Sequence, residues 1–199
     1  MPIYNPNKFT NKYKINSSRL QNWDYSIPGY YFITICTYNH NNFFGKIINN
    51  KIELSKRGEI TKSELLKTFE IRKNIKLHEW VIMPNHIHLL IQLFDILVET
   101  PCVASLQTNS KIKIINYTHK NHPNFYSRLN QKSNQLISKT IQQFKSAVTR
   151  QINPKIIFFA WQSRFHDQII KDEKELLIIK NYIQNNVINW NKDKYFIKS

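Results

Sequence analysis

Two histidines separated by one residue are the densest chemical signal in the sequence. His86 and His88 lie in the segment MPNHIHLL, where the second histidine and its neighbours form an otherwise apolar run. On a β-strand, residues i and i+2 point to the same face, so the two imidazoles lie together while Ile87 faces the opposite layer. Two imidazoles at this spacing can share a divalent metal ion, or they can be hydrogen-bonded polar residues of a half-exposed strand.

A second candidate group lies near the C-terminus, in the segment NYIQNN. Tyr182 and Asn186 are four residues apart and share one face of a predicted helix, beside its apolar stripe. A phenol that loses its proton is a nucleophile, and an amide oxygen one turn away can bind a metal ion. A tyrosine in this place can equally serve packing, so the pair gains meaning only beside the histidines.

The hydrophobic pattern predicts the elements that must position these groups. Strands alternate with helices in the order β, β-hairpin, α, β, β, α, β, α, which indicates an α+β fold with an antiparallel sheet and helices packed on one face. The predicted strands are residues 30–38, the two arms of a hairpin within 44–55, then 76–83, 86–93 and 165–170; the predicted helices are 55–72, 135–152 and one that begins at 172.

Three local signals fix where these elements turn or begin. The Asn49-Asn50 pair between isoleucine-containing arms predicts a tight hairpin, because asparagine tolerates positive φ. Ser55 is a predicted helix cap. Asp172 and Glu175 form a capping-box pattern at the start of the third helix.

One catalytic domain is predicted, over residues 29–190. Residues 1–28 form a polar, basic N-terminal arm, and residues 191–199 form a C-terminal tail. Residues 95–133 have no steady hydrophobic period and carry Pro101 and Pro123, so they predict a long loop insertion in the domain.

Charge indicates the kind of partner. The 199-residue chain has 29 Lys and Arg against 13 Asp and Glu, a formal net charge of +16. Such a field favours an anionic partner: nucleic acid first, an anionic membrane surface second, while part of the charge reflects a general excess of lysine. Hydrophobic residues at 41% exclude a disordered basic tail.

Composition also indicates the compartment. Cys36 and Cys102 do not make a disulfide framework, and Cys36 lies in an apolar run typical of a core residue in a reducing cytoplasm. The N-terminus has no apolar signal region, and no apolar run approaches the ~18 residues of a membrane span. A cytoplasmic protein without membrane contact is therefore expected.

The combination of the histidine pair with a helical tyrosine far downstream resembles the HUH single-strand DNA endonucleases and transposases, and within them the REP-associated tyrosine transposases. The resemblance covers nearly the whole chain, in six ordered blocks. These are DYSIPGYYFITICTYN (24–39), FFGKIINNKIELSKRGEI (43–60), EWVIMPNHIHLL (79–90), FKSAVTRQIN (144–153), WQSRFHDQIIKDEKEL (161–176) and YIQNNVINW (182–190).

The resemblance implies a ferredoxin-like sheet with the histidines on a central strand and the tyrosine on a C-terminal helix. It makes His86 and His88 metal ligands, Asn186 the third ligand and Tyr182 the nucleophile. With Mg²⁺ or Mn²⁺ bound, such enzymes cleave and rejoin single-stranded DNA at hairpin-forming repeats through a 5′-phosphotyrosine, which is a step of DNA transposition. The implied partner is single-stranded or hairpin DNA, bound by a monomer or a homodimer.

Two positions depart from the family pattern. Val187 stands where the family block has a proline that would end the helix, so the helix can run on for part of a turn past Asn186. Gln168 stands where relatives often carry a histidine, and His166 lies two residues away on the same strand face.

Basic residues next to aromatic ones suit a DNA path, because they offer phosphate contacts and stacking surfaces. Two other functions stay open from the sequence: a non-catalytic nucleic-acid-binding protein descended from such an enzyme, and a metal-dependent hydrolase that uses water as nucleophile. The candidate DNA-binding residues are Lys12, Lys14, Arg19, Lys145, Arg150 and Arg164.

Overall fold

A computed structural model describes residues 28–94, 136–153 and 158–197. Its elements alternate as the sequence predicts. They are β1 (Gly29–Cys36), β2 (Gly45–Ile48), β3 (Lys51–Leu54), α1 (Lys56–Glu70), β4 (Ile75–Ile82), β5 (His86–Leu93), α3 (Leu136–Ile152), β6 (His166–Ile170) and α4 (Glu173–Asn185), with short 3₁₀ turns at Tyr38–His40 and Trp190–Lys192.

Four strands form one antiparallel sheet in the order β4-β5-β1-β6, and β2 and β3 form a separate hairpin. This order, with α1 and α3 as the crossovers, is the ferredoxin-like arrangement that the family resemblance implies. β5 and β1 are the central strands, and Cys36 of β1 lies opposite His86 of β5.

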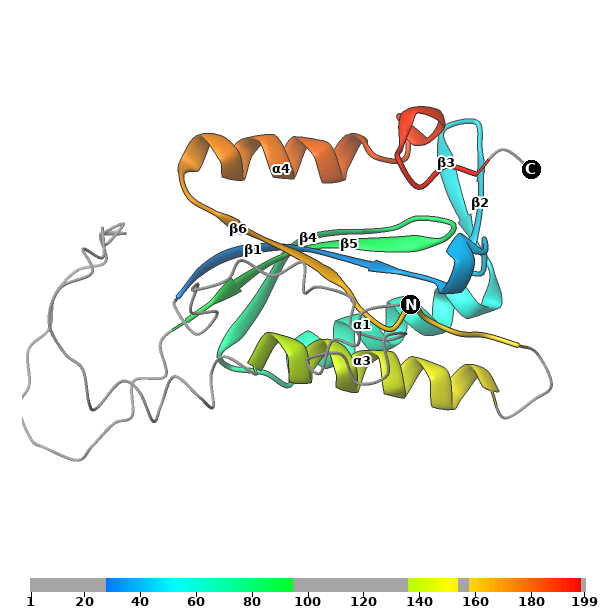
Figure 1. Ribbon diagram of the computed structural model, residues 1–199, viewed down its shortest axis with the longest axis horizontal. Coiled ribbons are helices and arrows are strands. Elements are labelled where there is room, and N and C mark those ends of the chain that lie inside the picture. Colours follow the sequence, from blue (N-terminus) through cyan, green and yellow to red (C-terminus); the bar gives the residue numbers. More distant parts are fainter. Residues whose placement is uncertain (1–27, 95–135, 154–157, 198–199) are drawn as a thin grey trace, which may run out of the picture.

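Helices cover both faces of this sheet (Figure 1). The expectation of helices on one face is wrong: α1 and α3 lie on one side, and α4 lies alone on the other. Its stripe, Ile179 and Ile183, packs on Leu90 of β5 in a small second core. Leu176 of the same helix also packs against this core, although most of α4 stays solvent-exposed.

β5 is buried from both sides because helices cover both faces. Ile87, Leu89 and Ile91 belong to the main core under α1 and α3, whereas Leu90 faces α4. The alternation of a strand therefore places His86 and His88 on the α4 face. Burying two imidazoles between a sheet and a helix requires that their nitrogens find partners.

The local signals of the sequence are confirmed at each turn and cap. Asn49 and Asn50 have φ of 49° and 57°, as in a type I′ hairpin. The Ser55 hydroxyl accepts a hydrogen bond from the Gly58 N–H at 3.2 Å, and the Asp172 carboxylate accepts one from the Glu175 N–H at 2.8 Å.

Several expectations fall on residues outside the described part of the chain. These include residues 1–27 of the basic arm, all of the 95–133 insertion, and Cys102 within it. Within the described residues, no helix is both long and apolar enough to cross a membrane.

Gly58 allows α1 to lie against the segment before the hairpin. A Cβ at this position would lie 2.2 Å from the Phe44 carbonyl oxygen and 3.0 Å from the Leu54 Cδ2 atom. We expect Gly58→Ala to lower the free energy of unfolding by about 2–3 kcal/mol, because overpacking outweighs the gain in helix propensity. Urea denaturation measures the change.

Gly29→Ala is the matched control, since a Cβ there meets nothing within 4 Å. Equal denaturation midpoints for the two variants would contradict the close approach of α1 to Phe44.

Candidate metal and nucleophile site

His86 and His88 meet on the α4 face of β5, as their spacing predicts. Their Nε2 atoms are 3.0 Å apart, and the two rings are 4.5 Å apart between centroids. Both side chains are almost fully buried, with exposed fractions of 0% and 1%. Two nitrogens of this kind, aimed at each other, require a shared proton or a shared cation between them.

The Nδ1 atom of His86 is held by the residue before it. Asn85 is buried, and its amide Nδ2 donates to the backbone carbonyls of His40 and Tyr195, at 3.1 and 2.8 Å. Its Oδ1 therefore accepts, and the His86 Nδ1 at 2.8 Å is the donor. With the proton on Nδ1, His86 presents a lone pair at Nε2.

The Nδ1 atom of His88 lies 2.9 Å from the Thr34 hydroxyl of β1. A hydroxyl both donates and accepts, so Thr34 is compatible with either tautomer of His88. With the His88 proton on Nε2, the imidazole donates to His86; with the proton on Nδ1, both Nε2 lone pairs face the same point. With Thr34 as its partner, the His88 Nδ1 keeps a hydrogen bond while the Nε2 lone pair is free to bind a cation.

Both imidazoles are neutral at physiological pH. Burial lowers the pKa of His86 to about 3, with smaller contributions from His40 and Lys194. Burial, then His86, lowers the pKa of His88 well below its usual value. Neutral imidazoles are the form that binds metal ions, so protons do not compete for these nitrogens near neutral pH.

Tyr182 brings its phenol to the same place from α4. Its Oη lies 3.2 Å from the His88 Nε2, and its ring packs edge-on against Phe32 of β1. Its Oη also donates to the Asp193 Oδ2 at 3.2 Å. Burial and the Asp193 carboxylate raise the pKa of Tyr182 to about 12, although a hydrogen bond from Asn186 acts in the opposite direction.

Asn186 follows the last residue of α4 and is buried. Its Nδ2 donates to the Asp193 Oδ2 at 3.1 Å, while its Oδ1 is buried without a hydrogen-bond partner among the described residues. Past Asn186 the chain continues in single turns, one of them closed by a bond from the Asn189 N–H to the Asn185 carbonyl. Although Val187 stands in place of proline, α4 ends at Asn185, and the helix does not run on past Asn186.

Asp193 is a residue of this site that sequence reasoning missed. One of its carboxylate oxygens, with the Nε2 or Nδ1 atoms of His86 and His88, forms a group whose atoms all lie within 4.8 Å of one another. The Tyr195 N–H donates to its Oδ1 at 2.7 Å, and the Tyr195 ring packs on His86, 4.7 Å between centroids. A single acidic residue in a lysine-rich tail carries no sequence signal, so only the contact reveals it.

This group of atoms fits a divalent cation. Two neutral imidazole nitrogens converge, and the Asp193 carboxylate lies within reach of both. The buried Oδ1 of Asn186 is an acceptor that has no hydrogen-bond partner among the described residues. Such a mixed nitrogen and oxygen set accepts Mn²⁺ or Zn²⁺, and Mg²⁺ with water as further ligands.

The candidate DNA-binding residues that the structure describes lie on another surface. Lys145 and Arg150 are on α3, across the sheet from α4, and line a groove with Trp161 and Phe165. The Lys145 ammonium lies 6.0 Å from the Trp161 ring centroid and donates to the Gln162 carbonyl; burial lowers its pKa to about 8. Lys12, Lys14 and Arg19 lie outside the described residues.

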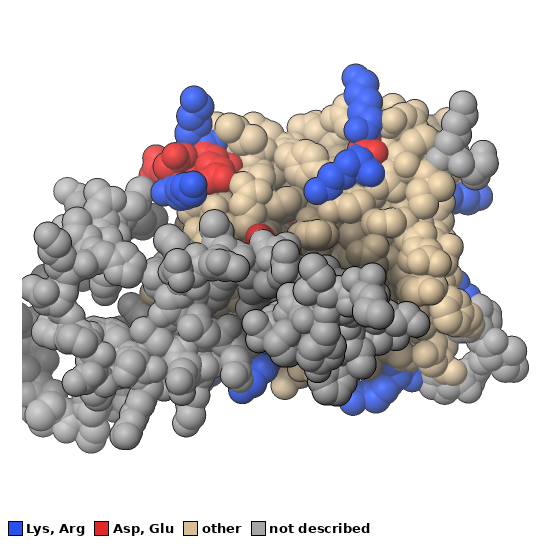
Figure 2. Space-filling view, in the orientation of Figure 1, with Lys and Arg blue, Asp and Glu red and all other residues tan. Residues whose placement is uncertain are grey.

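Gln162, which follows Trp161 of this groove, bonds to the end of the sheet that carries the histidines. The Gln162 N–H donates to the Cys36 carbonyl at 2.9 Å, and its side chain lies 3.0 Å from the His40 Nε2. Arg164 is exposed in the same connection. In Figure 2, lysine and arginine side chains stand in separate groups at the upper and lower margins, and acidic side chains gather where α4 begins.

Gln168 and His166, the second departure from the family pattern, lie on β6, which β1 separates from β5. The register places His166 opposite Thr34, which itself lies opposite His88. Gln168 and His166 are both exposed, and the Gln168 Nε2 donates to the Glu175 Oε1 at 2.6 Å. The side chain at position 168 thus joins β6 to the start of α4.

Comparison with known proteins gives relatives over most of the chain. No protein-family model matches. An uncharacterised protein of Haemophilus influenzae is 33% identical over 183 residues, an alignment that covers 91% of this chain and 92% of that protein. The structure of a REP-associated tyrosine transposase bound to a REP hairpin aligns with a TM-score of 0.52 and 15% identity, over 89% of this chain and 77% of that chain. The two proteins therefore share a fold.

The Thr34 hydroxyl can accept a hydrogen bond from a protonated His88 Nδ1, which gives a test of the cation site. Thr34→Val removes the acceptor for a His88 Nδ1–H at nearly unchanged volume, so we expect Mn²⁺ affinity to fall about 10- to 100-fold. Isothermal titration calorimetry measures the dissociation constant. Thr34→Ser keeps the hydroxyl and should bind Mn²⁺ as the native chain does; equal affinities for Val and Ser would refute this role of Thr34.

Proposed function

Because the chain belongs to one family with the Haemophilus influenzae protein and has the fold of a REP-associated tyrosine transposase, we propose that it cleaves and rejoins single-stranded DNA. The proposed substrate is DNA beside hairpin-forming repeats, and the proposed intermediate is a 5′-phosphotyrosine at Tyr182. The similar structure is described as bound to a REP hairpin, and the net charge of +16 suits a polyanionic substrate.

One observation carries this proposal: the Tyr182 phenol oxygen lies 3.2 Å from a ring nitrogen of the buried histidine pair. A tyrosine that served packing alone would have no need of a position at the convergence of two imidazoles and a carboxylate. A hydrolase would need room for water beside the histidines, whereas Tyr182 occupies that side of His88.

The chemical step uses the chain's own groups as follows. The Tyr182 oxygen attacks the scissile phosphorus, a tyrosine O–P bond forms, and the bond from phosphorus to the 3′ oxygen breaks to leave a 3′-hydroxyl. The phenol proton passes to Asp193, which already accepts its hydrogen bond, and the leaving oxygen takes a proton from solvent. Rejoining reverses the step, because the covalent link keeps the phosphodiester energy.

His86, His88, Asp193 and the Asn186 oxygen are the proposed holders of a divalent cation. Bound there, Mg²⁺ or Mn²⁺ would supply positive charge to the phosphate oxygens and to the phenol as it loses its proton. The phenol needs this help, because burial and Asp193 hold it protonated at neutral pH. Asn186 and Asp193 also orient Tyr182 from the end of its own helix.

The Tyr182 nucleophile gives the decisive test. We expect the native chain to form a covalent adduct with single-stranded hairpin oligonucleotides from the flanks of its own gene, in Mn²⁺ or Mg²⁺, that survives denaturing electrophoresis. Tyr182→Phe should lose the adduct, at least 10³-fold in rate, because the attacking oxygen is gone. Tyr38→Phe, at an exposed tyrosine, is the matched control.

Adduct formation by Tyr182→Phe would refute the assignment of the nucleophile. Hairpin binding by the native chain without any adduct, unaffected by chelation, would instead support a non-catalytic DNA-binding protein.

The α3 groove gives a test of DNA contact. If Lys145 and Arg150 hold phosphates, each change to Gln should weaken binding to the same degree for all sequences and lower the salt slope of log affinity by about 0.7–0.9. Fluorescence anisotropy across a salt series measures both. Lys51→Gln, at the exposed hairpin turn, is the charge-matched control; equal slopes for all three variants would place the DNA path elsewhere.

A further inference from the structure

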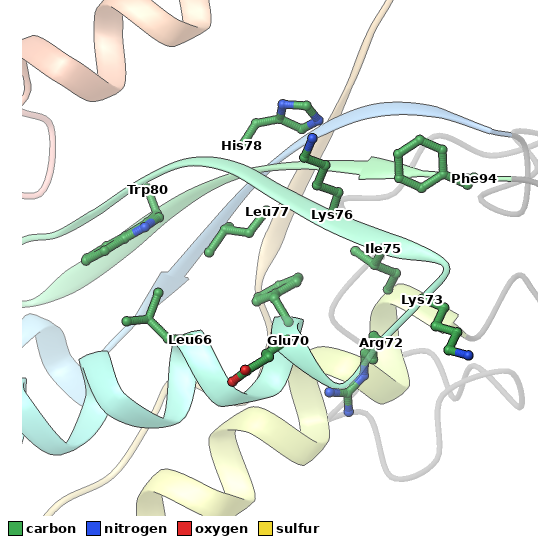
Figure 3. A pocket seen from close by; sticks show the side chains of 11 residues that line it. Leu66, Glu70, Arg72, Lys73, Ile75, Lys76, Leu77, His78, Trp80 and Phe94 are labelled. Carbon is green, nitrogen blue, oxygen red and sulfur yellow. The ribbon is translucent and has the colours of Figure 1, made fainter.

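A groove runs along the outer edge of β4, away from the histidine site (Figure 3). Its walls come from β4, the C-terminal half of α1 and the residue after β5. In Figure 3, Trp80 stands at one end and Phe94 at the other, with Leu66 and Glu70 below the strand. Neither the proposed cleavage nor the α3 groove uses these residues.

Large apolar side chains of the groove are exposed to solvent. Leu66 is 44% exposed and Phe94 is 42% exposed, although both are large apolar residues. Trp80 and Leu77 pack against the main core and are only partly buried. Flat aromatic side chains that keep one face open are the surfaces on which unpaired bases stack.

Positive charge borders the same groove. Arg72, Lys73 and Lys76 line it, against one carboxylate, Glu70. Arg72 is fixed there, because its guanidinium donates to the Thr68 carbonyl and to the Gln143 side chain. Within the described part of the chain, Lys73 and Lys76 form no ion pair, so their charge is available to an anion.

The edge of the sheet gives the groove its length. Among the described strands, β4 pairs only with β5, so its outer side has no neighbouring strand. An extended polymer can therefore lie along it. Of the extended polymers, a single nucleic-acid strand has both the flat bases for Trp80 and Phe94 and the regular phosphates for Lys73 and Lys76.

We propose that this groove binds a single-stranded segment of the DNA substrate, with bases against Trp80 and Phe94 and phosphates at Lys73 and Lys76. The proposal rests on the proposed function for the identity of the DNA. His86 is the first residue of β5, and Phe94 follows its last residue. At about 3.3 Å per residue, Phe94 at the groove's far end lies roughly 26 Å from His86 and roughly 20 Å from His88, so it contacts the strand several nucleotides from the bond that is cut.

Binding of fluorescein-labelled oligonucleotides, measured by anisotropy with the full chain, tests the groove. Each oligonucleotide carries the hairpin with a single-stranded flank of either 4 or 20 nucleotides. On the long flank, Trp80→Leu should weaken binding about tenfold, and Lys76→Gln should weaken it and lower the salt slope by about 0.7. Glu70→Gln should strengthen binding, because it removes the one carboxylate. On the short flank all three should bind as the native chain does.

Lys56→Gln is the matched control, because Lys56 is exposed at the start of α1, the helix that ends at Glu70. This variant should bind both oligonucleotides as the native chain does. Thermal unfolding of each variant separates a loss of fold at Trp80 from a loss of contact, and the exposed Lys76 and Glu70 test the groove independently of the core. Native affinity for the long flank in Lys76→Gln and Glu70→Gln would overturn the proposal. So would Trp80-dependent binding of polyglutamate in place of DNA.

The covalent adduct at Tyr182 distinguishes this proposal from the proposed function. If the groove variants bind like the native chain while the adduct still forms, only the groove proposal is rejected. Groove effects without any adduct reject the cleavage chemistry and leave a DNA-binding surface.

Discussion

The burial of two imidazoles on a central strand is the constraint on which the site depends. β5 has apolar side chains on one face and His86, His88 and Leu90 on the other, and helices cover both faces. Polar ring nitrogens removed from water must be hydrogen-bonded or bind a cation. Asn85 and Thr34 occupy the Nδ1 atoms, which leaves the two Nε2 atoms to face each other at 3.0 Å.

Everything else in the site is arranged around those two Nε2 atoms. α4 docks on the sheet through few apolar residues, and this docking sets the Tyr182 phenol beside His88. The turn after α4 then returns the chain, so that Asp193 bonds to Tyr182 and Asn186 together. The positions of Tyr182, Asn186 and Asp193 relative to the histidines thus depend on how α4 packs on the sheet.

The positive charge of the chain is spread over surfaces with different surroundings. On α3, Lys145 is partly buried against Trp161 and already donates a hydrogen bond to a backbone carbonyl. Its ammonium group therefore contributes to the packing of the fold. At the β4 edge, Lys73 and Lys76 are exposed beside open aromatic surface. The same residue type therefore has different capacity for a phosphate, and local contacts decide this rather than the net charge of +16.

The amino-acid sequence alone specifies the local structure and brings chemical groups together along one element. The alternation of side chains along a strand placed His86 and His88 on one face, the Asn49-Asn50 pair made the hairpin, and Asp172 capped α4, because these signals act between residues close in the chain. Long-range packing places α4 on the second face of the sheet and brings Asp193 and Thr34 to the imidazoles. Those contacts join residues far apart in sequence or lie in a tail without periodicity, and packing of the whole chain is what brings them together.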